Sequence, residues 1–152
     1  MIELITNQKY LNRAVDAVRA LEIRDLPRPT WAEIDLSASA YNIRRICEIV
    51  GPQVKVLAMV KAEAYGHGMA GIARVAERAG ASMLGVATLS EALALDEASS
   101  LPKLVVGWTP GWQAELAIKG DVICAIADLE TASEFARAAQ AMGKPAHVHV
   151  KV

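Results

Sequence analysis

The stretch from Lys61 to Gly68 places a lysine, a tyrosine and a histidine close together, directly behind the apolar run 56–60. A lysine at the lip of an apolar pocket is partly desolvated, and desolvation favours the neutral amine, which is the nucleophilic and basic form. Such an amine forms a Schiff base with a carbonyl compound or with pyridoxal phosphate. A lysine at a strand end can also simply extend into solvent.

The residues behind the lysine have both chemical and structural interpretations. Tyr65 has a hydroxyl that could donate to a phosphate or position a cofactor, or that could find a backbone partner in a packed core. Gly66 and Gly68 permit positive φ angles and close approach of the backbone. His67 lies between them, and we expect it to hold the loop through hydrogen bonds rather than to transfer protons.

Apolar strands that alternate with helices are expected to position these residues. The predicted strands are residues 54–60, 83–88, 103–108, 121–127 and 146–152. The helices between them are expected from Ser37 to Gly51, over 70–79, from Ser90, from Pro110 to Gly120, and around Phe135 to Gly143. Strands that are apolar on both faces indicate a parallel sheet covered on both sides.

The expected fold class is α/β, namely the N-terminal part of a TIM-type (β/α)₈ barrel. About five strands and four to five helices amount to roughly half of a barrel, which typically takes ~250 residues. Functional residues of such barrels lie at the carboxyl ends of the strands, where Lys61 is placed. No glycine-rich dinucleotide-binding motif follows the first strand, which disfavours a Rossmann unit.

The first part of the chain predicts a separate segment. Residues 1–23 have the apolar spacing of an amphipathic helix, and Pro27 and Pro29 then interrupt it. Residues 30–36 alternate like a strand. We therefore expect an N-terminal helical extension over 1–28 and a partial barrel over 29–152.

Composition limits the partners and the compartment. The 152 residues include 16 basic and 17 acidic side chains, so we expect no nucleic acid or membrane surface as partner. No secretory signal or membrane-spanning run is visible, and Cys47 and Cys124 are expected to be buried free thiols, which fits a reducing cytoplasm. His147 and His149 lack a third ligand, so no metal site is expected.

The run Lys-Ala-x-Ala-Tyr-Gly-His-Gly over residues 61–68 closely resembles the pyridoxal-phosphate lysine motif of the alanine racemases. The resemblance extends from about Pro29 to Val152, through the segments RPTWAEIDL, YNIRRI, ARVAERAGAS, LGVATLSEALAL and HVHVKV. RPTWAEIDL resembles the opening strand of the family, and HVHVKV resembles its fifth barrel strand. The supporting segments keep the order and spacing of the family.

This resemblance implies a function and a set of roles. Lys61 would hold pyridoxal 5′-phosphate and act as general base or acid on one face of the α-carbon of L-alanine or D-alanine. The group on the other face would be a tyrosine from the second subunit of a homodimer. Tyr65 would contact the cofactor phosphate, and the cofactor cavity would be lined by Met59, Leu104 and Val106. D-alanine made in this way would supply cell-wall precursors.

Two further positions follow from the resemblance. Lys151 matches a lysine that is carbamylated in many members of the family, where the new anion orients an arginine; an unmodified lysine is the alternative. Glu63 stands where the family usually has asparagine or aspartate, and its carboxylate is either harmless or repels the phosphate or substrate carboxylate. The three tryptophans are better interpreted as packing residues than as substrate contacts, namely Trp31, Trp108 and Trp112.

Further expectations concern the extent of the chain and the competing functions. Because the second base and the phosphate-binding residues have no counterpart in the sequence, we expect the chain to be part of a longer enzyme and inactive by itself. One alternative is a single-domain protein that binds pyridoxal phosphate in cofactor homeostasis. The other is a racemase of another amino acid, such as serine, or one of broad specificity.

Overall fold

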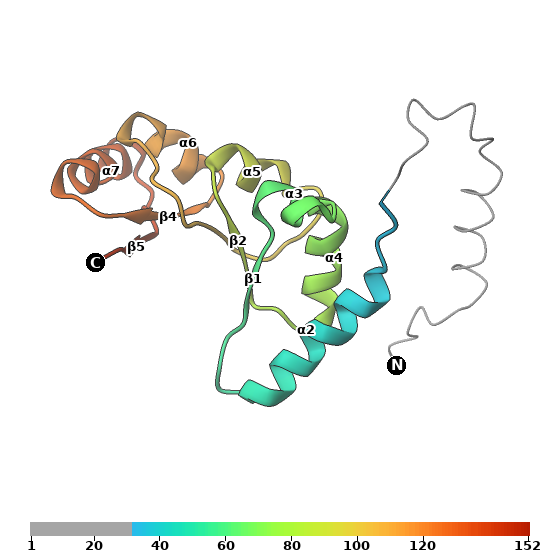
Figure 1. Ribbon diagram of the computed structural model, residues 1–152. Helices are drawn as coiled ribbons and strands as arrows, with labels where there is room; N and C mark the ends of the chain where they lie inside the picture. Colours follow the sequence, from blue (N-terminus) through green and yellow to red (C-terminus); the bar gives the residue numbers. More distant parts are fainter. Residues whose placement is uncertain (1–31) are drawn as a thin grey trace, which may run out of the picture.

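The computed structural model describes residues 32–152 (Figure 1). The helix expected over 1–23, the interruption at Pro27 and Pro29, and Trp31 lie outside these residues. Six α-helices and five strands alternate in the described part. The expected α/β architecture of a partial (β/α)₈ barrel is confirmed, with one short helix more than predicted.

The sheet is parallel throughout, and its strands follow chain order. The strands are β1 (Leu57–Met59), β2 (Met83–Val86), β3 (Lys103–Val105), β4 (Ile123–Ile126) and β5 (Val148–Val150). They are shorter than the apolar runs that predicted them, because only three or four residues of each run belong to the paired strand. Because the strands are parallel, their carboxyl ends all lie along the same edge of the sheet, the one that runs across the strands.

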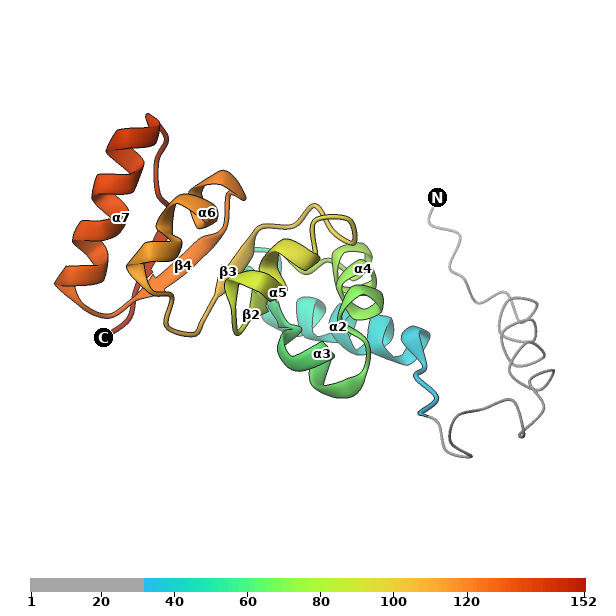
Figure 2. The same cartoon turned by 90° about the horizontal axis from the view of Figure 1, so that it is seen from above.

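Within residues 32–152, one helix precedes the first strand, two lie between the first and second strands, and one lies in each later connection (Figures 1 and 2). They are α2 (Leu36–Val50), α3 (Lys61–Gly66), α4 (Met69–Ala79), α5 (Leu89–Ala94), α6 (Ala114–Lys119, after the 3₁₀ turn Gly111–Gln113) and α7 (Leu129–Met142). Helices α2 and α4 pack side by side at one end of the sheet, and α6 packs with α7 at the other.

One face of the sheet forms the hydrophobic core with the helices. Its largest fully buried apolar residues, Val60, Leu84, Val86, Val105 and Cys124, alternate along the strands with residues of the opposite face. Burial raises the pKa of the Cys124 thiol, although a contact with Thr109 acts in the other direction. Cys47 and Cys124 are both free, as expected, but Cys47 is only half-buried.

Two helices begin at a different residue from the one predicted. Asp35 caps α2, because its side chain accepts hydrogen bonds from the backbone nitrogens of Ser37 and Ala38. The strand expected over 30–36 is therefore wrong in its described part: residues 32–35 form no strand, and Leu36 already belongs to the helix. At α5 the cap is Thr88, two residues before the expected Ser90.

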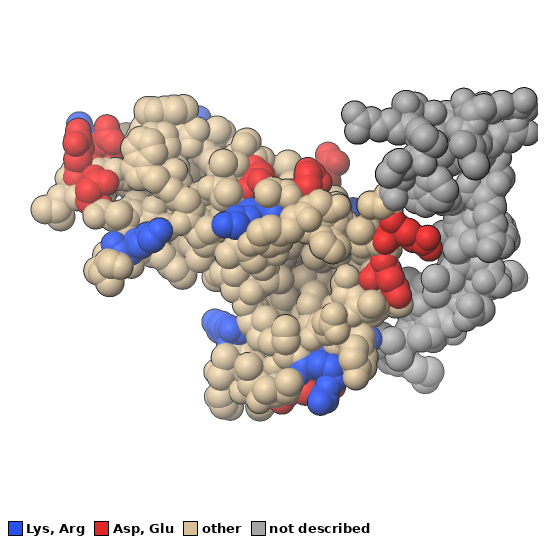
Figure 3. Space-filling model, in the orientation of Figure 1, with Lys and Arg blue, Asp and Glu red and all other residues tan. Residues whose placement is uncertain are grey.

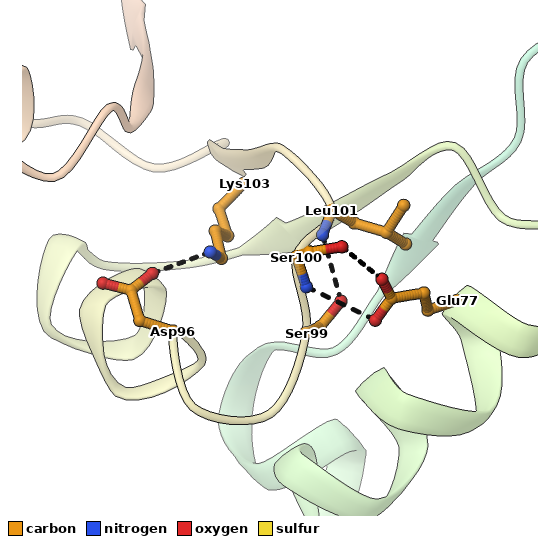
Figure 4. A network of polar contacts seen from close by, with 6 residues as sticks. All are labelled: Glu77, Asp96, Ser99, Ser100, Leu101 and Lys103. Carbon is orange, nitrogen blue, oxygen red and sulfur yellow. Dashed lines mark hydrogen bonds and ion pairs between the residues drawn. The ribbon is translucent and has the colours of Figure 1, made fainter.

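A polar network joins α4 to the connection between α5 and β3 (Figure 4). Ser100 donates its hydroxyl and its backbone N–H to the two carboxylate oxygens of Glu77, and hydrogen bonds from Ser100 and Ser99 lower the pKa of Glu77. The buried Lys103 donates to Asp96 over 2.7 Å. Buried charges need such partners, so the pair accounts for a lysine on the helix-covered face of the sheet.

Charged side chains of both signs are distributed over the face shown in Figure 3, and no field of one sign covers it. This distribution agrees with the balanced composition of the chain. No helix within residues 32–152 is long and apolar enough to cross a membrane.

The short helix α3 was not predicted, and its backbone is left-handed. Residues 62–65 have φ angles between 51° and 56°, and none of them is glycine. The turn is closed by the backbone N–H of Ala64, which donates to the carbonyl oxygen of Val60 over 2.9 Å. A left-handed turn costs L-residues roughly 1–2 kcal/mol each, so surrounding structure must hold this one in place.

A pair of glycine substitutions tests the packing of β3 on the chain that follows β2. A Cβ at Gly107 would lie 2.4 Å from the carbonyl oxygen of Ala87, whereas one at Gly71 in α4 would meet only methyl groups of Leu36 at 3.7 and 3.9 Å. We expect Gly107→Ala to lower the free energy of unfolding by about 1–3 kcal/mol. Gly71→Ala should raise it by about 1 kcal/mol, since alanine is the better helix former. Denaturant titration of both variants measures this, and equal stability of the two would contradict the close approach.

A second pair tests the left-handed turn. Ala62 is exposed with a positive φ, and Ala70 is exposed in the right-handed α4. Ala62→Gly should raise the free energy of unfolding by about 0.5–1 kcal/mol, because glycine adopts this conformation without strain. The same substitution at Ala70 should lower it by about 1 kcal/mol. A loss of stability in both variants, seen in the same denaturant titration, would argue against the strained conformation.

Candidate functional site

Lys61 lies at the carboxyl end of β1 and is half-buried. The residue before it, Val60, is fully buried and donates its backbone N–H to the carbonyl oxygen of Gly85 over 2.8 Å, which is the last hydrogen bond between β1 and β2. The sheet thus delivers the lysine to the edge where the other strands also end. This is the position that the sequence predicted for it.

A row of paired residues crosses the first three strands on the face opposite the helices. Met59 pairs with Gly85, and Gly85 pairs with Leu104. Because residues paired in this way share a face of the sheet, Met59 and Leu104 lie on the same face with a glycine between them. A Cβ at Gly85 would lie 2.6 Å from Leu57 Cδ2 and 2.9 Å from Met59 Cε, so the missing side chain makes room for both.

Val106 continues this face beyond the end of β3. It is half-buried, and its backbone N–H donates to the carbonyl oxygen of Val86 over 2.9 Å. Val106, Met59 and Leu104 together form an apolar surface near the carboxyl ends of β1 to β3, which we call the apolar floor. The structure therefore brings Met59, Leu104 and Val106 to the end of the sheet that carries Lys61, whereas their contact with a cofactor stays a prediction.

The left-handed turn presents Tyr65 to solvent. The side chain of Tyr65 is 62% exposed, so its hydroxyl is available to a ligand. The ring of His67 is tied back to the turn, with Nδ1 2.9 Å from the carbonyl oxygen of Ala64, in agreement with a structural role. Glu63 accepts a hydrogen bond from the backbone N–H of Met69 over 3.1 Å, which directs its carboxylate toward the start of α4.

Glu91 joins the turn behind β1 to the turn behind β2. Its Oε1 accepts from the backbone N–H of Ala62 over 2.9 Å, and its Oε2 accepts from those of Ala87 over 2.7 Å and Thr88 over 3.3 Å. Burial alone would raise the pKa of Glu91, but these hydrogen bonds and the charge of Lys61 together lower that pKa. The carboxylate is therefore ionised at neutral pH.

Sequence reasoning did not identify Glu91 as part of the site. The signal was present, because Thr88 and Glu91 have the threonine-x-x-glutamate spacing of a capping box, and both reciprocal hydrogen bonds of that box are formed. The cap was instead assigned to Ser90, and the contact with Ala62 joins residues 29 positions apart. A contact of this range requires the tertiary structure.

Lys151 lies far from Lys61 in the described sheet. Its backbone N–H donates to the carbonyl oxygen of Ile126 over 2.8 Å, just beyond β5, and the residue is exposed. Strands β1 and β5 are the two outer strands of the described sheet, so both lysines lie at the carboxyl ends of strands but three strands separate them. Carbamylation of Lys151 stays a prediction.

The interpretation of Trp108 and Trp112 as packing residues is wrong. They are 69% and 79% exposed, and they line a shallow pocket of 280 Å³ together with Glu130 and Glu134. Both lie in the connection between β3 and α6, on either side of the buried Thr109. Among residues 32–152, no group of three histidine, cysteine, aspartate or glutamate side chains could hold a metal ion.

Comparison with known proteins places this site in a family. The family model for alanine racemase, N-terminal domain, matches residues 34–152. The alanine racemase of Desulforamulus reducens is 41% identical over 128 residues, which cover 84% of this chain and 35% of that protein. The relative therefore extends well beyond the matched region.

Solved structures agree with the sequence comparison. The alanine racemase of Clostridium difficile 630 matches with a TM-score of 0.74 and 34% identity, over 84% of this chain and 34% of its own. The alanine racemase of Bartonella henselae with covalently bound pyridoxal phosphate matches with a TM-score of 0.72 and 26% identity, over 78% of this chain and 35% of its own. This chain spans about a third of the length of these relatives. The matched family model, the sequence identity and the shared fold show that the chain belongs to the alanine racemase family.

Proposed function

We propose that this chain provides the cofactor-binding lysine of a pyridoxal-phosphate-dependent alanine racemase, with Lys61 as the attachment point. The observation that carries the proposal is Lys61 at the carboxyl end of β1, followed by a strained turn that presents Tyr65. Strained backbone of this kind is concentrated at functional sites. The relatives named above as alanine racemases support the same assignment.

The residues present fit pyridoxal phosphate. A half-buried amine and an exposed phenol lie on one turn, next to an apolar floor in which Leu57 and Met59 pack over Gly85. A Cβ at Gly66 or at Gly68 would meet no atom within 4 Å, so the backbone on that side of the turn is open to a ligand. When bound, the cofactor supplies an electron-withdrawing ring that makes the α-hydrogen of an amino acid acidic.

Each residue then has a distinct task. The amine of Lys61 would hold the cofactor and would take or return the proton at one face of the α-carbon. The hydroxyl of Tyr65 donates to the phosphate. The apolar side chains of Met59, Leu104 and Val106 would exclude water from the cofactor ring and orient it.

The wider assignment extends the proposal to the substrates, the assembly, the role and the location. We propose L-alanine and D-alanine as the substrates, a homodimer as the assembly, supply of D-alanine for the cell wall as the role, and the cytoplasm as the location. Residues 29–152 would form part of the cofactor-binding barrel, with residues 1–28 as an extension. Carbamylation of Lys151 would convert its cation to an anion that can orient a nearby arginine.

Covalent capture tests the attachment point. The chain is incubated with pyridoxal phosphate, reduced with borohydride, digested and examined by mass spectrometry. We expect the reduced adduct on Lys61, because this amine combines partial burial with an open approach. Lys61→Arg should abolish that adduct, and Lys55→Arg, a change of an exposed lysine before the strand, should leave it intact. A folded chain labelled elsewhere, or not at all, would refute the assignment.

The role of Tyr65 has its own test. Tyr65→Phe should weaken pyridoxal phosphate binding roughly tenfold, which is the size expected for one hydrogen bond to a charged group. Binding of pyridoxal, which lacks the phosphate, should be unchanged. Fluorescence titration with both ligands separates the two effects. Equal weakening for both ligands would show that the phenol does not contact the phosphate.

A further inference from the structure

We propose that Glu91 is a positioning residue for Lys61: its carboxylate holds the left-handed turn in the conformation that presents the amine. The proposal rests on the proposed function of Lys61 as the cofactor lysine. It concerns a residue on α5, the helix that follows the neighbouring strand β2.

Glu91 is hydrogen-bonded directly to the residue that follows the lysine. Ala62 is the first left-handed residue of the turn, and its backbone N–H donates to Glu91 Oε1 over 2.9 Å. On the other oxygen, the N–H groups of Ala87 and Thr88 donate over 2.7 Å and 3.3 Å. One carboxylate thus ties the end of β1 to the end of β2.

The strain of the turn explains why such a hold is needed. Residues 62–65 all have positive φ angles without being glycine, and an isolated chain would leave that conformation. Relaxation at Ala62 would rotate the backbone next to Lys61 and move its amine relative to the apolar floor. An ionised acceptor makes the stronger kind of hydrogen bond to a backbone N–H, so Glu91 is suited to oppose this relaxation.

The charge of Glu91 also bears on the lysine. The positive charge of Lys61 contributes to lowering the pKa of Glu91, so the two side chains interact electrostatically. Glu63, the other carboxylate of the turn, is directed to the backbone of Met69 at the start of α4. Glu91 is therefore the carboxylate, within residues 32–152, that contacts both the turn of the lysine and the next strand end.

A simple capping role is separable from positioning. In the capping box, Thr88 Oγ1 accepts from the backbone N–H of Glu91 over 3.3 Å, and this bond does not involve Ala62. Thr88→Val removes it and leaves the carboxylate of Glu91 in place. Glu91→Gln keeps the size of the side chain but offers a single acceptor oxygen. Two backbone donors face Oε2 and one faces Oε1. We therefore expect the glutamine oxygen to keep the hydrogen bonds from Ala87 and Thr88, and the hydrogen bond from Ala62 to be lost.

The experiment compares the 152-residue chain with its Glu91→Ala, Glu91→Gln, Thr88→Val and Glu97→Gln variants. Glu97 is an exposed glutamate in the segment that follows α5, and it serves as the charge control. Two quantities are measured: the rate of borohydride-trapped capture of pyridoxal phosphate at Lys61, and hydrogen exchange at the amide of Ala62. Circular dichroism and thermal unfolding show which variants are folded.

We expect both Glu91 variants to capture the cofactor at Lys61 roughly tenfold more slowly, which corresponds to about 1.4 kcal/mol, and to exchange the Ala62 amide faster. Thr88→Val should lower the melting temperature but leave the capture rate and the Ala62 exchange rate at their wild-type values. Glu97→Gln should change none of the three quantities. If Glu91→Ala does not fold, Glu91→Gln decides.

Two results would overturn the proposal. The first is wild-type capture and exchange in a folded Glu91→Gln chain, and the second is an equal effect of Thr88→Val, which would reduce Glu91 to a helix cap. A wild-type chain that captures nothing at Lys61 would instead refute the proposed function. Exchange at Ala62 would then still decide whether Glu91 holds the turn.

Discussion

Parallel pairing of five consecutive strands is the constraint on which the site depends. In a parallel sheet whose order follows the chain, every strand ends at the same edge, and every connection to a helix begins there. Lys61, Glu91 and Val106 come from segments behind three different strands, yet this arrangement places them at one edge. The pairing of Met59 with Gly85 and of Gly85 with Leu104 then sets how the apolar floor is aligned beneath that edge.

The same pairing determines which side chains lie on each face of the sheet. The helix-covered face is filled by large apolar side chains such as Leu84 and Val105, and it supplies the stability of the fold. The opposite face carries Met59 and Leu104, and the side chains of Leu57 and Met59 fill the space above Gly85. The strained turn behind β1 depends on both, because buried Val60 anchors its start and Glu91 holds its first residue.

Much of the fold could be predicted from the residues alone. Runs bounded by glycine and proline identified all five strands; most are apolar on both faces, and the last alternates valine with His147, His149 and Lys151. The motif around Lys61 identified the family, whereas the role of this lysine and its cofactor stay proposals. Element ends were predicted less well: hydrogen bonding by Asp35 and Thr88 starts two helices earlier than Ser37 and Ser90 would, and side-chain geometry of that kind is not visible in apolar spacing.

The sequence by itself determined which residues can do chemistry and the order in which the elements follow. The motif from Lys61 to Gly68 and the apolar run before it are local features, so they can be recognised without coordinates. Only the tertiary structure decided that residues 62–65 wind to the left, that Trp108 and Trp112 are exposed, and that Glu91 reaches Ala62. These outcomes depend on contacts between residues far apart in the chain, and local propensity favours the opposite in the first case, because L-residues prefer right-handed turns.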